Sequence, residues 1–232
     1  MNKRIAVVLF NLGGPDNLKA VQPFLFNLFF DPAIINLSLP FRWLLAKYIS
    51  KRRAPIAQEI YEHLGGKSPI LNLTKNQSNA LQLALKDEGD VRCFIAMRYW
   101  HPMTLETVGD VKKFAPDEII LLPLYPQFST ATTGSSFQEW HKVSNIENLC
   151  VNTKALCCYP TDGGWIDAQV DLILEKMKKV KNCDKLRILF SAHGLPKKII
   201  VAGDPYKEQV ERTAIAIAEK LDNKSIDWIV CY

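Results

Sequence analysis

LRILFSAHGLP, residues 186–196, is an apolar run that ends abruptly at His193 among small and helix-breaking residues. Residues 188–190 form a short segment without polar alternation, which is typical of a strand buried on both faces of a parallel sheet. Gly194 and Pro196 end that strand. Open parallel sheets bind ligands just beyond the carboxyl ends of their strands, so the sequence places His193 where a ligand would bind.

The imidazole of His193 allows two interpretations. Such a ring titrates near neutral pH and can ligate a metal, which would suit a functional site. The same ring could instead cap the strand by bonding a neighbouring carbonyl, with no role in binding. The local sequence leaves both interpretations open.

Strand-like and helical segments alternate along the whole chain. Strands are expected at residues 5–10, 91–97, 118–124, 151–156, 186–191 and 226–232, and helices at 55–64, 68–87, 104–113, 165–180 and 205–221. This alternation predicts a doubly wound parallel sheet. The expected division is a first α/β domain over residues 1–150 and a second over 151–232.

The composition is that of an ordinary soluble protein. The 232 residues are 48% hydrophobic and 23% charged, and the net charge of +5 is too small to indicate nucleic-acid binding. The apolar run after Arg4 is too short for a signal peptide. The cysteines have no C-x-x-C spacing, which argues against a zinc site and favours a reducing cytoplasm. They are Cys93, Cys150, Cys157, Cys158, Cys183 and Cys231.

The most apolar segment, residues 21–48, is too interrupted to cross a membrane. Asp31, Pro32 and Lys47 break it before it reaches the length that a bilayer requires. We expect two short amphipathic pieces joined at prolines and followed by the basic residues 51–53. This combination suits a lid over an apolar ligand, a segment lying on an anionic membrane surface, or a helix pair packed on the core.

Two loops that follow strands lack the signatures of nucleotide binding. Residues 11–16 contain two glycines but no G-x-G-x-x-G pattern, and residues 123–136 are rich in hydroxyl and aromatic groups but have no Walker lysine. A nucleotide is therefore not expected as a ligand. Gly134 and the serines after it could open a helix whose amides attract a carboxylate.

Several separated segments together resemble the ferrochelatase family, which inserts ferrous iron into protoporphyrin IX to make haem. Any one segment would be a weak signal, but the set in this order is highly specific. The segments are Asn11–Pro15, Lys51–Arg53, Gly65–Ile70, Arg98-Tyr99, Tyr125–Ser129, Thr132–Ser135, Ser191–Pro196 and Gly203–Tyr206. The resemblance runs through nearly the whole chain. It implies two similar doubly wound parallel-sheet (Rossmann-like) domains, the second incomplete at its C-terminal end.

The resemblance also implies roles for individual residues. The family's metal-side catalytic histidine falls on His193, and Arg98 and Tyr99 match a catalytic pair on the opposite wall of the porphyrin pocket. The apolar stretch from Phe24 to Arg53 matches the pocket lip, which could also contact a membrane surface. The matching porphyrin-binding positions are Leu12, Arg53, Tyr61, Ser68 and Ser129.

Two departures change what the resemblance implies. Some relatives hold an iron–sulfur cluster partly through a loop cysteine, and Thr130 stands at that position, so no cluster is expected here. Family members also continue past Tyr232, through a segment that supplies a glutamate facing the histidine. We therefore expect an incomplete enzyme that binds porphyrin weakly and inserts little metal.

Two other functions compete with metal insertion. A non-catalytic tetrapyrrole-binding or carrier protein would use the same pocket, with His193 as an axial ligand. An unrelated doubly wound hydrolase would use His193 in a catalytic triad, but the sequence has no G-x-S-x-G elbow to support it. The preferred porphyrin, the iron donor and the oligomeric state stay open.

Overall fold

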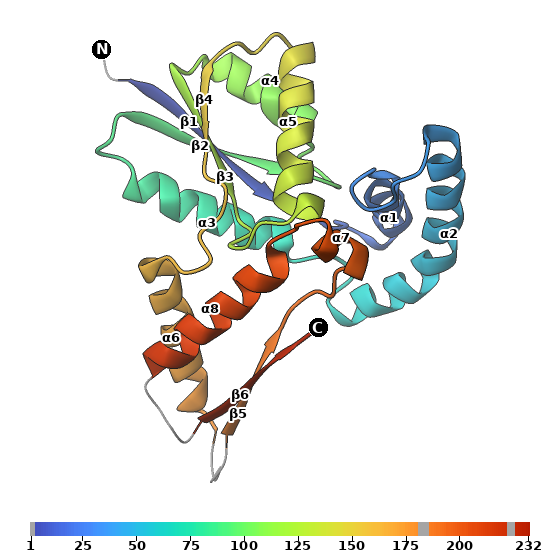
Figure 1. The fold of residues 1–232 in the computed structure, drawn as a ribbon. Helices are drawn as coiled ribbons and strands as arrows, with labels where there is room; N and C mark the ends of the chain where they lie inside the picture. The colour runs from blue at the N-terminus through green and yellow to red at the C-terminus, as the bar shows by residue number, and fades with distance from the viewer. Residues whose placement is uncertain (1–2, 181–185, 222–225) are drawn as a thin grey trace. The chain divides into compact units, whose positions relative to one another are not determined.

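The computed structural model describes residues 3–180, 186–221 and 226–232, so Cys183 lies outside the described residues. The chain forms two compact units. The first comprises Met1–Tyr125 and Thr130–Cys157, and the second comprises Pro126–Ser129 and Cys158–Tyr232. Each unit contains a parallel sheet with helices packed on it (Figure 1), which confirms the predicted α/β class.

The boundary between the units differs from the expected division at residue 150. Strand β4 (Asn152–Ala155) pairs with β3 (Glu118–Pro123), so it completes the first sheet and does not open the second. The segment Pro126–Ser129 instead belongs to the second unit, where Gln127 Nε2 donates to Thr213 Oγ1 at 2.9 Å. Hydrophobic pattern alone cannot show which sheet a strand joins, because strand pairing depends on distant residues.

The first unit is built on a four-stranded parallel sheet in the order β2-β1-β3-β4. Strand β1 (Arg4–Asn11) lies between β3 and β2 (Asp90–Met97). Helix α3 (Ile70–Ala84) packs on one face of the sheet, and α4 (Thr104–Phe114) and α5 (Ser135–Ile146) pack on the other (Figure 1). The first sheet is therefore doubly wound, as predicted.

Strand β1 supplies the core on both faces of this sheet. Val7 and Leu9 belong to the cluster on the α3 side, and Val8 and Phe10 to the cluster beneath α4 and α5. Phe10 meets the ring of Trp140 edge-on, with centroids 5.8 Å apart. Because side chains alternate between faces, a strand covered on both sides must be apolar throughout, which explains the continuous run after Arg4.

The apolar segment of the first unit forms α1 (Val21–Phe30) and α2 (Leu39–His63), which pack against each other. Two short pieces joined at prolines and a separate helix from Pro55 to Leu64 were expected. The first piece is α1, but the second is not short and no separate helix begins at Pro55. A single helix of 25 residues runs through Pro55. No helix among the described residues is long and apolar enough to span a bilayer.

Helix α2 has contacts with the rest of the first unit both before and after Pro55. The buried residues Ala46, Ser50 and Ala54 are spaced four apart and therefore lie on one face. Their small side chains allow close packing before the proline. After it, Ala57 and Tyr61 are half-buried, and Gln58 Nε2 donates to the Leu18 carbonyl at 2.9 Å. Pro55 removes one backbone donor and kinks a helix, and Figure 1 shows α2 bending along its length.

The second unit is built on a two-stranded parallel sheet of β5 (Leu186–Ser191) and β6 (Ile226–Cys231). Helices α6 (Gly163–Met177) and α8 (Tyr206–Leu221) pack on this sheet around a core that includes Ile166, Val170, Ile217 and Phe190.

Three short elements of the described chain had no counterpart in the sequence-based expectation. They are α7 (Lys197–Val201), a 3-10 turn (Leu18–Ala20) and a π-helical turn (Thr130–Gly134).

The expectation that residues 188–190 are buried on both faces is wrong. Burial alternates along β5, and Leu189 is 62% exposed. Phe190 instead joins the core formed with α6 and α8. Among the described residues of this unit, helices pack on only one face of the sheet, so every second side chain of β5 meets solvent.

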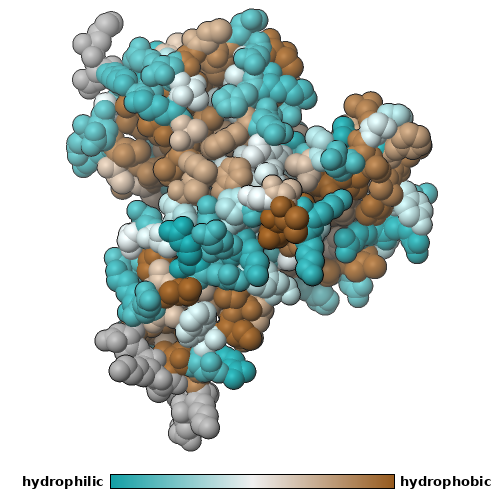
Figure 2. All heavy atoms as spheres, in the orientation of Figure 1, coloured by the Kyte–Doolittle hydropathy of each residue, from teal (hydrophilic) through white to brown (hydrophobic). Residues whose placement is uncertain are grey.

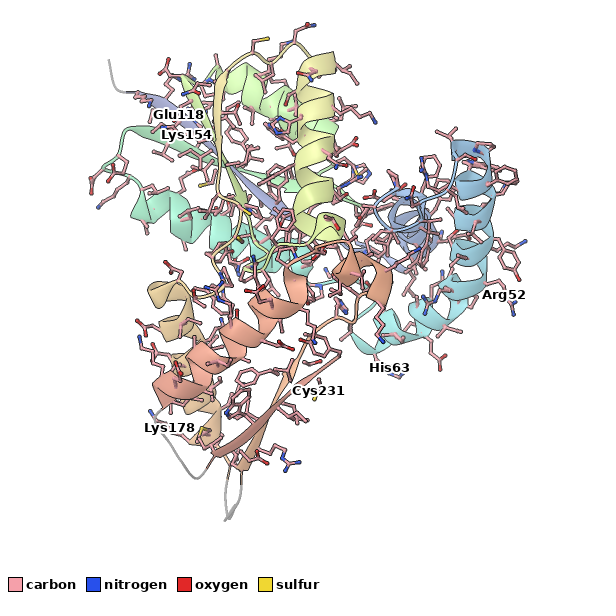
Figure 3. The ribbon with its side chains drawn as sticks, viewed as in Figure 1. Arg52, His63, Glu118, Lys154, Lys178 and Cys231 are labelled. Carbon is pink, nitrogen blue, oxygen red and sulfur yellow. The ribbon has the colours of Figure 1, made fainter. Side chains whose placement is uncertain are left out.

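Glu118, at the start of β3, links the edge of the first sheet to two lysines. Its carboxylate is buried, accepts a hydrogen bond from Lys3, and forms an ion pair with Lys154 on β4 at an N–O distance of 2.5 Å. Figure 3 shows Glu118 and Lys154 side by side. Lys154 and Lys3 together lower the pKa of Glu118 below its usual value of 4.5.

The lowered pKa predicts an acid-sensitive contribution to stability. A group whose pKa is lower in the folded state stabilises the fold above its unfolded pKa, and this contribution is lost as the pH falls through the folded pKa. We expect Glu118→Gln to lower the free energy of unfolding at pH 7 and to matter progressively less below pH 4.5. Urea unfolding of both proteins across this range measures the difference, with Asp110→Asn as an exposed control. A difference that does not change with pH would contradict the prediction.

Candidate functional site

His193 lies just beyond the carboxyl end of β5. The Ala192 N–H donates to the Cys231 carbonyl at 2.8 Å, which continues the pairing of β5 with β6 by one residue. The next residue is His193, whose backbone N–H donates to the Tyr206 hydroxyl at 3.2 Å. The structure therefore places this histidine where ligands bind in parallel sheets.

The imidazole ring of His193 is free to meet a ligand. The residue is exposed, and neither ring nitrogen makes a hydrogen bond or ion pair with any residue that the structure describes. The alternative in which the ring caps a neighbouring carbonyl is therefore wrong. One nitrogen of a neutral imidazole is a proton acceptor, so His193 can take a proton or contact a metal.

A cavity of about 540 Å³ opens beside His193 within the second unit. Most of its surface is apolar, and two lysines contribute the positive charge. Its lining consists of His193, Gly194, Leu195, Lys197, Ile200, Val201, Tyr206, Lys207 and Tyr232. Such a surface suits a ligand with a large apolar body and negatively charged groups at its edge.

Buried polar groups hold the residue that contacts the His193 backbone. Asp204 accepts a hydrogen bond from the Tyr206 backbone N–H through Oδ1 and from the Ser129 hydroxyl through Oδ2, both at 3.0 Å. Ser129 and Asp204 are 1% and 7% exposed. Ser129 thus has a partner inside the second unit, and its proposed contact with porphyrin stays a prediction.

In the first unit, residues from three segments meet at the carboxyl edge of the sheet. The Tyr99 N–H donates to the Leu12 carbonyl at 3.0 Å, and the Ser68 N–H donates to the Pro15 carbonyl at 2.8 Å. Leu12, Ser68, Arg98 and Tyr99, which the resemblance assigns to the site, therefore lie around the ends of β1 and β2.

Gly14 permits the close approach of these segments. A Cβ atom at this position would lie 2.5 Å from the Ser68 hydroxyl oxygen, closer than any real contact. Gly13 has a positive φ of 83°, which favours glycine. The two glycines in the loop after β1 thus serve backbone geometry beside Ser68.

Arg98 and Tyr99 are both bound to Asp31, a residue that sequence analysis missed. The Tyr99 hydroxyl donates to Asp31 Oδ2 at 2.8 Å, and Arg98 Nη2 lies 2.9 Å from the same oxygen. Burial, and then the negative charge of Asp31, raise the pKa of Tyr99 far above its usual value. The sequence offered one signal, an acidic side chain directly after an apolar helix.

Arg53 and Tyr61 come from α2, eight positions apart, so they lie near one face of that helix. Arg53 is exposed, whereas Tyr61 is half-buried and has a pKa raised by that burial. Their roles in porphyrin binding stay predictions. No three His, Cys, Asp or Glu side chains gather as metal ligands in the described part of the chain, and His193 remains the candidate for metal contact.

Comparison with known proteins decides the family. The family model described as ferrochelatase matches residues 4–232. The chain belongs to the ferrochelatase family. This confirms the resemblance found in the sequence motifs and agrees with the Rossmann-like α/β architecture of both units.

Relatives named ferrochelatase occur in several bacteria. The chain is 52% identical to one from Pelagibacter ubique over 98% of its own length and 66% of the relative. It is 53% identical to one from a Wolbachia of Drosophila simulans, over 98% of this chain and 73% of the relative. A Caulobacter vibrioides relative is 53% identical over the whole chain and 67% of its own length. The chain thus spans about two thirds of the length of the ferrochelatases it matches.

Proposed function

We propose that this chain carries out the ferrochelatase reaction, the insertion of ferrous iron into protoporphyrin IX or a closely related porphyrin. The observation that supports this most is the exposed imidazole of His193, with both ring nitrogens free, on the wall of an apolar cavity. Family membership supplies the reaction class. The cavity supplies a surface that suits a flat, largely apolar substrate with carboxylates.

The reaction requires a group of this kind. Porphyrin presents two pyrrole N–H groups, and the metal enters the ring plane only after both protons leave and the macrocycle bends. A neutral imidazole within reach accepts one of these protons or passes the metal, and a site that holds the ring bent lowers the barrier through ground-state strain. We assign the proton or metal transfer to His193.

Apolar contact supplies most of the proposed binding energy, at about 25 cal/mol for each Å² of apolar surface removed from water. Leu195, Ile200 and Val201 provide such surface beside His193. Lys197 and Lys207 line the same cavity and can pair with propionate groups. Arg53 is exposed on α2 and is a further candidate for such pairing.

The direct test is metal insertion by the purified protein. Protoporphyrin is incubated with ferrous iron or zinc, and the loss of free-porphyrin fluorescence and the appearance of the metalloporphyrin spectrum are followed. We expect turnover that is low, as expected from the sequence, but above the rate of the same mixture without protein. A Soret band that persists with bound porphyrin but without metal turnover would favour the carrier alternative instead.

We further propose that the chain holds no resident iron–sulfur cluster and no nucleotide. Thr130 stands where cluster-binding relatives have the loop cysteine, and its hydroxyl is a poor ligand for such a cluster. The purified protein should therefore be colourless unless porphyrin or haem is bound. Acid-labile sulfide in stoichiometric amount would overturn this prediction.

We also propose that the lip, residues 24–53, contacts the inner face of a membrane while the protein resides in the cytoplasm. Exposed apolar side chains gather on α2 and the segment before it, as Figure 2 shows over this part of the first unit. They are Ile34, Leu37, Leu39, Phe41, Trp43, Leu44 and Tyr48. Lys51, Arg52 and Arg53 are exposed on the same helix, and Figure 3 shows Arg52 extending from it. Apolar groups beside cations suit an anionic lipid surface.

A further inference from the structure

Asp31 is the centre of a buried polar network in the first unit. It follows α1 directly and is 4% exposed. Its Oδ2 atom accepts hydrogen bonds from the hydroxyls of Tyr99 and Ser135 and pairs with Arg98. Its Oδ1 atom accepts the Ala33 N–H at 2.8 Å. Both carboxylate oxygens are thus engaged, as a buried charge requires.

The network fixes one edge of the Arg98 guanidinium. Nη2 lies 2.9 Å from Asp31 Oδ2, and Nε donates to the Ser135 hydroxyl at 2.7 Å. Because Ser135 in turn donates to Asp31, the Nε and Nη2 side of the planar group has one fixed orientation. Any ligand that meets Arg98 must use its remaining N–H groups.

The same network connects the lip to the end of β2. Asp31 joins α1 to Tyr99, which is 1% exposed, and Asn27 of α1 adds a bond of 3.1 Å to the Tyr99 carbonyl. Ser135 adds the N-terminus of α5. Three segments that are distant in sequence therefore depend on one carboxylate.

We propose that Asp31 is a positioning residue, which orients Arg98 at the edge of the first sheet and holds the lip beside it. Tyr99 supports this role by holding Asp31 in place: its hydroxyl is buried and donates to the Asp31 carboxylate, so it does not meet a ligand itself. A buried ion pair contributes little net stability compared with an apolar replacement, so fold stability alone does not explain why Asp31 is paired with Arg98. The need to hold the Arg98 guanidinium in one direction explains the pair. The effect on catalysis rests on the proposed function, whereas the orientation of Arg98 does not.

The first test follows Arg98 itself and needs no activity. The side-chain Nε–H signals of arginines are recorded by nitrogen–proton NMR, and Arg98→Lys identifies the signal of Arg98. We expect this proton to exchange with water at least tenfold faster in Asp31→Asn than in the unchanged protein, with Asp110→Asn as the exposed control. Equal exchange in the unchanged protein and Asp31→Asn would overturn the proposal, whether or not the protein inserts metal.

The second test separates positioning from stability. Asp31→Asn leaves the partly buried Arg98 charge with only the more distant Glu139, 4.0 Å from Nη2, and should unfold more easily. Asp31→Asn combined with Arg98→Gln removes both charges and should recover most of the stability. If Asp31 acts by positioning Arg98, then Asp31→Asn, Arg98→Gln and the double variant each lose roughly 10²-fold in kcat/KM for porphyrin, so the two single losses do not multiply. Losses that multiply in the double variant would show that Asp31 acts independently of Arg98 and would overturn the proposal. Recovery of activity together with stability would reduce the network to a structural role and overturn the proposal. An inactive unchanged protein would contradict the proposed function alone, because the NMR test still decides the role of Asp31.

Discussion

His193→Ala should lower the rate of metal insertion by about 10²- to 10⁴-fold, the range expected when a positioned acid–base group is removed. Porphyrin affinity should change little, because apolar walls and carboxylate pairing provide most of the proposed binding. The substitution is also expected to leave the fold intact, since the side chain is exposed and its ring makes no contact with a polar partner among the described residues. His193→Ala should therefore lose insertion rate without losing porphyrin affinity.

Two measurements on one preparation check this expectation. Fluorescence titration with protoporphyrin gives the affinity, and insertion of zinc or ferrous iron gives the rate. His141→Ala is the matched control, because His141 is an exposed histidine on α5 with no assigned role. Added imidazole should restore part of the rate only in His193→Ala. Retained insertion in that variant would remove His193 from the mechanism.

Replacing Lys51, Arg52 and Arg53 together by serine should weaken binding to anionic vesicles by roughly 10²-fold. Each basic residue near such a surface contributes about 1 kcal/mol, so three contribute about 3 kcal/mol, and each 1.4 kcal/mol corresponds to about tenfold in affinity. Binding of the unchanged protein should also fall as salt is added, because ions screen the attraction. The apolar side chains of the lip remain in this variant.

Co-sedimentation with vesicles that contain phosphatidylserine measures the effect. The matched control replaces Lys176, Lys178 and Lys179, which are exposed in the second unit and carry the same total charge. Figure 3 shows Lys178 in this group. Equal binding by the lip variant and the unchanged protein would exclude electrostatic docking through these residues. The apolar face of α2 would then be the only part of the proposal left.

Local sequence patterns predicted the strands well. The run after Arg4 is apolar without alternation, and β1 is indeed covered by helices on both faces. The same pattern at residues 188–190 led to the wrong conclusion, because β5 has helices on one face only among the described residues. A short apolar run predicts that a strand forms, but it does not predict whether helices cover one face of the sheet or both.

Local patterns also placed the wrong boundary in α2. Pro55 looked like the start of a helix, as proline often is, yet the helix begins at Leu39. The buried stripe of Ala46, Ser50 and Ala54 packs the helix before the proline, and the Gln58 hydrogen bond to the Leu18 carbonyl holds it beyond. Small side chains give no periodic apolar signal, so the sequence did not reveal this packing face.

The sequence by itself determined the family, the α/β class and the position of His193 after a strand, because motifs and periodicity depend on neighbouring residues. Tertiary structure decided which sheet β4 joins, that the His193 ring is free, and that Asp31 holds Arg98 and Tyr99. Asp31 is separated from Tyr99 by 68 positions and from Ser135 by 104. Burial strengthens such a contact by removing water from around the charges, and no local pattern records which distant residues the fold buries together.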